Sequence, residues 1–124
     1  MDNETNELMD YLYKISHKSL HGDIPWNQQN PSTFQWIQSS DNDHFQVTIQ
    51  KAATPPLRGL LILEAKEQSI YLFQVQDKSN KQTVISLSSK ERPEVYPALS
   101  EIFHGAEKGM DVRAGNVLKR LLGE

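Results

Sequence analysis

Residues 44–50, HFQVTIQ, decide the fold expected for this chain of 124 residues. Apolar and polar side chains alternate along the stretch: Phe45, Val47 and Ile49 against His44, Gln46, Thr48 and Gln50. Successive side chains of a β-strand point to opposite faces of its sheet. The alternation therefore predicts a strand with one face on a core and the other open to solvent, as in many antiparallel sheets. We expect the open face to be wet or available for binding.

Four further strands are predicted around this one, at residues 33–38, 57–65, 69–76 and 82–88. Two of the connections, SSDND and DKSNK, are short and rich in side chains that bond to their own backbone. Such turns between successive strands indicate an antiparallel meander. Residues 57–65, LRGLLILEA, are almost continuously apolar, which is typical of a central strand covered on both faces.

The chain before the sheet predicts a helix over residues 3–20. Leu8, Leu12 and Ile15 recur at spacings of four and three, which places them on one helix face. Gly22 follows, and glycine readily adopts the positive φ that ends a helix.

Residues 23–32, DIPWNQQNPS, predict a loop, because Pro25 and Pro31 remove backbone donors and polar amides lie between them. Ile24 and Trp26 are too apolar to remain in water. We expect both to pack over the sheet edge or the first helix.

The C-terminal third is predicted to be helical, starting at Pro93 or Pro97, since proline is tolerated in a first turn. Its apolar stripe consists of Val95, Leu99, Ile102, Phe103 and Ala106. Gly109 is expected to end or bend the helix, with a last helix starting near Asp111. The whole pattern predicts one α+β domain over residues 1–124: an N-terminal helix, a five-stranded antiparallel β-meander, and one or two C-terminal helices packed on one sheet face.

The composition excludes several classes of function. Thirteen Lys and Arg against sixteen Asp and Glu give a net charge of −3, which provides no basic field for a nucleic acid. Cysteine is absent, which excludes disulfides, thiolate zinc sites and cysteine nucleophiles. No apolar run approaches the ~20 residues that span a bilayer. The first residues, MDNETNELMD, do not resemble a signal peptide, so we expect a cytoplasmic protein without membrane partners.

Three histidines are the candidates for metal binding or acid–base chemistry. His17 and His21 are four residues apart on a predicted helix, which puts both imidazoles on one face, with Asp23 as a third candidate ligand. His104 has glutamates nearby in sequence that suit proton transfer. No HExxH, GxSxG or phosphate-binding glycine motif accompanies them, so we interpret all three as solvated side chains and expect no cofactor, metal or catalytic residue.

The favoured hypothesis is a non-enzymatic protein-interaction or regulatory module whose partner is another protein or a second copy. Its surface is expected at Trp26, Trp36, Gln46 and Thr48, since tryptophan is favoured at interface hot spots. The hypothesis predicts that Trp26 or the C-terminal helix is partly exposed. Nucleic acid is not expected, although Lys108, Arg113, Lys119 and Arg120 form a small basic group.

Two alternatives stay open. A small secretion-type chaperone would also be acidic and α+β, and a helix inside residues 43–88 would favour it. An enzyme or a small-ligand or metal-binding protein would use His17, His21 or His104, and it predicts a pocket that joins one of these to carboxylates.

The chain resembles a widespread bacterial family of small α+β domains that has no established activity. The resemblance lies in LYKISHKSLHGDIPW (12–26), with its Gly-x-x-x-Trp spacing, in IYLFQVQDKSNKQTVISL (70–87), and in PALSEIFHGAEKG (97–109) with NVLKRLL (116–122). The family's closing helix usually carries more arginine where HGAEK stands here, and the strand LRGLLILEA is longer than expected. The resemblance implies a small bacterial α+β domain and no site residues.

Overall fold

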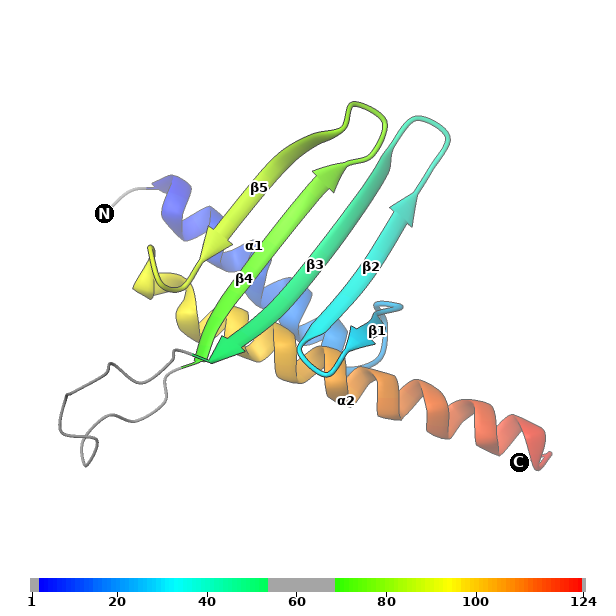
Figure 1. Cartoon of the computed structure of the whole chain (residues 1–124). Helices are drawn as coiled ribbons and strands as arrows, with labels where there is room; N and C mark the ends of the chain where they lie inside the picture. Colours follow the sequence, from blue (N-terminus) through cyan, green and yellow to red (C-terminus); the bar gives the residue numbers. More distant parts are fainter. Residues whose placement is uncertain (1–2, 54–68, 124) are drawn as a thin grey trace, which may run out of the picture.

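The protein, a computed structural model described over residues 3–53 and 69–123, has two layers (Figure 1). Its elements are α1 (Asn3–Leu20), β1 (Asn27–Asn30), β2 (Thr33–Ser39), β3 (His44–Ala53), β4 (Ser69–Asp77), β5 (Gln82–Ser88), the 3-10 helix η1 (Pro93–Val95) and α2 (Tyr96–Leu121). The strands form one antiparallel sheet in the order β1-β2-β3-β4-β5. Both helices lie behind one face of this sheet, which confirms the predicted α+β architecture.

The register of the sheet explains why the alternation in β3 is decisive. Ile49 lies opposite Phe34 of β2 and Phe73 of β4, and Phe73 lies opposite Leu87 of β5. This row of buried side chains crosses four strands on the helical side. A shift of one residue in any pairing would turn that strand's apolar set towards solvent.

The strand predictions hold for β2 to β5, with bounds that differ by a few residues at most. The predicted strand at 57–65 lies outside the described residues. The loop prediction is wrong for residues 27–30, which form β1. All four side chains of β1 are exposed, so no apolar pattern marks it, and it exists because its backbone pairs with β2.

The end of α1 follows the sequence closely. Gly22 has φ of 78°, and two hydrogen bonds close the helix: Asp23 N to Lys18 O at 2.9 Å and Gly22 N to Ser19 O at 3.1 Å. This pair of bonds is the Schellman motif, which satisfies carbonyls that a helix end leaves free. The chain then turns towards the sheet edge, and Ile24 and Trp26 are buried as expected.

The prediction that Gly109 ends the C-terminal helix is wrong, because α2 is one helix of 26 residues. Gly109 instead lies where α2 crosses α1, and a Cβ atom there would overlap the carbonyl oxygen of Ser19. Gly105, one turn earlier, would place a Cβ 3.1 Å from Ser16 O. The two glycines permit close contact between the helix backbones, and that packing offsets their poor helix propensity.

Candidate interaction surfaces

Trp26 is fully buried, with an exposed fraction of 0%, so its expected surface role is wrong. Its Nε1 donates a hydrogen bond of 2.8 Å to Ser19 Oγ, which lies in the last turn of α1. A buried indole N–H normally finds such a partner. Trp26 is therefore a core residue that joins the segment after α1 to the helix itself.

Trp36 lies on the helical side of β2 and is half-buried against the core. Its ring meets that of Trp26 edge to face, with centroids 5.7 Å apart. Its Nε1 is buried without a hydrogen-bond partner among the described residues. The side chain faces the helices rather than the open face of the sheet, so it does not share a surface with Gln46 and Thr48.

Gln46 and Thr48 lie on the open face of the sheet, away from the helices. The register places the following residues on this face: Gln35, Ile37, Gln46, Thr48, Gln50, Leu72, Gln74, Gln76, Ser86 and Ser88. None of these side chains carries a charge. Gln46 Nε2 donates a hydrogen bond to Gln35 Oε1 at 2.8 Å, and Gln74 Nε2 donates one to Ser86 Oγ at 3.3 Å. Polar side chains of neighbouring strands on this face therefore bind one another.

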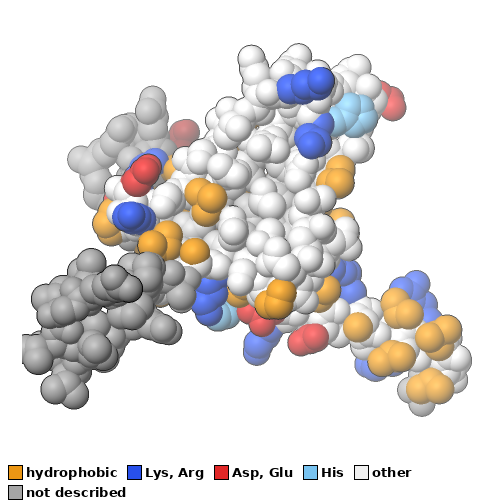
Figure 2. Space-filling view, viewed as in Figure 1, with side chains coloured by type: hydrophobic (Ala, Val, Ile, Leu, Met, Phe, Trp, Pro, Cys, Tyr) orange, Lys and Arg blue, Asp and Glu red, His pale blue; other side chains and the backbone are white. Residues whose placement is uncertain are grey.

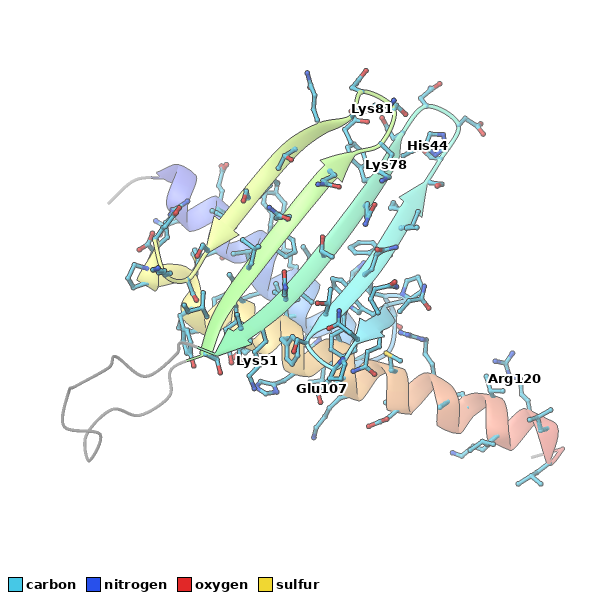
Figure 3. The ribbon with its side chains drawn as sticks, viewed as in Figure 1. His44, Lys51, Lys78, Lys81, Glu107 and Arg120 are labelled. Atoms are coloured by element: carbon cyan, nitrogen blue, oxygen red, sulfur yellow. The ribbon has the colours of Figure 1, made fainter. Side chains whose placement is uncertain are left out.

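Charges on this side of the molecule lie away from the middle of the sheet. Figure 2 shows the open face as a broad white area with a few separate orange side chains, and with blue and red side chains at its rim. His44, Lys78 and Lys81 lie at the tips of the two hairpins, and Lys51 lies at the opposite end beside α2 (Figure 3). The open face is thus uncharged and mostly polar, as the alternation in β3 predicts, with Ile37 and Leu72 as apolar side chains on it.

The second surface is the C-terminal part of α2, which projects beyond the rest of the molecule (Figure 1). We call it the projecting end and define it as residues 114–122. Its large apolar side chains are exposed by 45% at Val117, 59% at Leu118, 76% at Leu121 and 75% at Leu122. In Figure 2 they form a cluster at the tip of the helix. The interaction hypothesis predicts that Trp26 or the C-terminal helix is partly exposed. The helix is exposed, and Trp26 is buried.

Arg113 marks the place where α2 leaves the body. Its guanidinium donates to the carbonyl oxygens of Ile24 and Trp26, both in the segment that follows α1. These hydrogen bonds involve an ionised donor and are stronger than neutral ones. The Arg113 guanidinium is therefore bound to the protein's own backbone. Of the basic group suggested by the sequence, this leaves Lys108, Lys119 and Arg120 for a ligand.

Two of the three candidate histidines, His17 and His104, line the same groove. A groove between α1 and α2 is lined by Tyr13, Ser16, His17, Leu20, Glu101, His104, Gly105 and Lys108. His104 Nδ1 is 3.9 Å from Glu107 Oε1, with more than half of each side chain exposed, and the rings of His17 and His21 meet edge to face. Within residues 3–53 and 69–123, no group of three or more His, Cys, Asp or Glu side chains is placed to hold a metal ion. The groove joins two histidines to a carboxylate, but all three side chains belong to exposed residues.

In the part of the chain that the structure describes, no helix combines the length and the apolar character needed to cross a bilayer. Comparisons with models of known protein families, with curated proteins and with solved structures found no match to this chain, so the resemblance to a bacterial domain family stays a prediction.

Proposed function

We propose that the protein is a non-enzymatic interaction module that binds a partner protein through the projecting end of α2. The observation that carries this proposal is the exposure of Leu118, Leu121 and Leu122 on a helix that contacts no other described element there. Fully burying one leucine side chain is worth roughly 1.5–3 kcal/mol, so a partner that covers this stripe gains substantial free energy.

The spacing of the apolar residues suits a helix that lies in a groove. Met110, Ala114, Val117 and Leu121 follow one another at intervals of four, three and four, which is the pattern of an a/d seam. The first of them is half-buried against the core, and the later ones continue the same stripe into solvent. This is the helix-in-groove mode of recognition, with anchors about one turn apart.

The stability of the helix itself also favours a partner. A short helix without tertiary packing is marginal in water, and the projecting end contains Gly115, Asn116 and Val117, which are weak helix formers. A bound partner would supply the packing that the body supplies to the rest of α2. The stripe itself carries no charge, so we expect the partner's groove to be apolar.

The test is affinity purification from the native host with two double variants that change the charge equally. Leu118→Glu with Leu121→Glu places two carboxylates on the stripe. Asn116→Glu with Arg120→Gln makes the same change in charge on the opposite helix face. We expect a stoichiometric partner that binds the natural chain and the second variant but is lost from the first.

Circular dichroism and thermal unfolding of both variants control for folding. A partner retained equally by both variants, or no stoichiometric partner at all, would contradict the proposed function of the projecting end.

The other functions expected from the sequence have less support. The described parts of residues 43–88, which are 43–53 and 69–88, consist of strands and turns, so nothing there favours a secretion-type chaperone. The cytoplasmic location stays a prediction.

A further inference from the structure

The two edges of the sheet differ in how they are protected. β1 has four residues, a register shift within it, and Pro31 directly after it. Short edge strands, irregular pairing and proline are the usual devices that prevent an edge from pairing with another chain. β5 has seven residues, QTVISLS, with no charge and no proline, and no described strand pairs with its outer side. Its register with β4 also shifts, at Val84, so the two edges differ in length and in proline rather than in regularity.

The backbone of β5 offers free hydrogen-bonding groups on that outer side. Ser89 N donates to Tyr71 O at 3.0 Å, which fixes Ser89 as a residue whose backbone faces β4. Backbone direction alternates along an antiparallel strand, so Leu87 also faces β4 while Ser86 and Ser88 face outwards. The carbonyl of Ser88 already accepts a hydrogen bond from Arg92 N at 2.9 Å. Within residues 3–53 and 69–123, no backbone group pairs with the N–H and C=O of Ser86 or with the N–H of Ser88, so these groups remain for another strand.

We propose that the outer edge of β5 pairs with β5 of a second copy of this chain, antiparallel, with the two-fold axis at Ser86. The two sheets then become one continuous sheet with all helices on the same side. Ser86 of each copy exchanges both backbone hydrogen bonds with Ser86 of the other.

This register makes β5 complementary to itself. On the core side it sets Ile85 of one copy opposite Leu87 of the other, so the row of apolar side chains continues across the axis. On the open face it sets Ser86 opposite itself, and Lys81 and Lys90 lie beyond the paired residues, so no like charges meet. Closed two-fold dimers are the commonest symmetric assemblies, and they need a surface that is complementary to itself.

The position of α1 agrees with this arrangement. The first turns of α1 extend past β5 on the helical side of the sheet (Figure 1). Leu8 in these turns is only half-buried. A second β5 alongside the first would extend the sheet beneath that part of α1.

The experiment measures mass in solution by light scattering or sedimentation at sub-millimolar concentration. We expect the natural chain to have twice the monomer mass of 14.2 kDa. Ser86→Pro removes an outward N–H without touching the bonds to β4, and it is expected to give the monomer mass. Ser86→Ala keeps the N–H and is expected to remain a dimer.

A second pair of variants keeps the test decisive if Ser86→Pro fails to fold. The two-fold axis places residue 86 opposite itself, so Ser86→Lys alone and Ser86→Glu alone should each be monomeric. An equimolar mixture of the two should recover the dimer mass, because lysine then lies opposite glutamate.

A natural chain that is monomeric at this concentration would overturn the proposal and leave the edge to a strand of a different protein. A Ser86→Lys variant that stays dimeric would also overturn it. The variant Leu118→Glu with Leu121→Glu should remain a dimer. If it becomes the monomer instead, the projecting end of α2 and not β5 joins the copies.

Discussion

At the scale of single residues, Ser19 connects three parts of the fold. It is fully buried in the last turn of α1, and its Oγ accepts the hydrogen bond from Trp26 Nε1 and donates to Ile15 O at 2.6 Å. Its carbonyl is the group that leaves no room for a Cβ at Gly109. A larger side chain at position 19 would meet α2, and a side chain without an oxygen would leave Trp26 without a partner.

Ser19→Ala is expected to destabilise the protein by about 1–3 kcal/mol, because it leaves the N–H of Trp26 buried and unpaired while the packing stays almost unchanged. Ser16→Ala is the matched control. Ser16 is also buried in α1, but its Oγ makes only a long contact of 3.5 Å with Glu101. Urea unfolding of both variants measures the difference, and equal losses would show that the hydrogen bond to Trp26 contributes nothing.

The direction in which each tryptophan points was only partly predictable. Trp26 lies among prolines and amides with no periodicity, so its apolar character indicates packing but not a surface or a core position. Trp36 belongs to a strand with Phe34 at the same parity, which does indicate the core side. The sequence alone does not show that Ser19 lies within hydrogen-bonding distance of the Trp26 indole, and so it does not place that residue in the core.

At the scale of elements, the crossing of α1 and α2 depends on glycine at particular positions. The helices contact each other through Gly105 and Gly109 on one side and Ser16 and Ser19 on the other. A glycine in a helix costs about 1 kcal/mol in propensity relative to alanine, and this cost was the basis for expecting a break at Gly109. Close packing at the crossing outweighs it, and sequence alone does not show that α1 lies there.

Gly109→Ala is expected to destabilise the fold by about 1–3 kcal/mol or more, since its methyl group must displace the backbone of α1. Gly115→Ala, in the same helix, is expected to stabilise it by up to about 1 kcal/mol, because no described heavy atom lies within 4 Å of the added methyl group. Thermal unfolding compares the two. A gain at position 109 similar to that at 115 would indicate that helix propensity, and not the crossing, decides both results.

The strands show what periodicity can and cannot predict. β3 and β4 are marked by alternation because one face is buried, although β3 continues to Ala53, beyond the end predicted at Gln50. β1 carries no such signal, because Asn27, Gln28, Gln29 and Asn30 are all exposed. Its pairing with β2 comes from the turn at Pro31 and Ser32 and from the position of the buried Trp26 beside it, which are tertiary facts.

At the scale of the whole molecule, stability is expected to differ along α2. The part up to Met110 packs on α1 and the sheet, while the projecting end contacts neither. Local opening costs little where few apolar groups are buried. The same helix should therefore behave as two segments, with Arg113 at the boundary.

Hydrogen exchange measures this directly. We expect the backbone amides of residues 116–122 to exchange far faster than those of residues 102–110, which should open only with the whole fold. Addition of a partner captured by the purification described above should slow exchange at the projecting end. Uniform protection along α2 in the isolated chain would contradict the boundary at Arg113.

For the candidate surfaces too, some features follow from the residue pattern and others depend on tertiary packing. The neutral open face was predictable, since polar residues alternate with the core residues of β3. The apolar stripe of Val117, Leu118 and Leu121 was also visible, but it indicated one more packed helix. Whether such a stripe is covered depends on where α1 and the sheet end beneath α2, and no residue of the stripe encodes that.

The length of α2 gives the molecule a lever. From Gly109 to Leu121 the helix rises about 18 Å, at about 1.5 Å for each residue. If the helix rotates about 10° around the glycine crossing, its tip moves by roughly 3 Å, which is the length of a hydrogen bond. The crossing angle between α1 and α2, which Gly105 and Gly109 permit, therefore determines the position of Leu121. A change in that angle would move the binding surface for a partner at the projecting end.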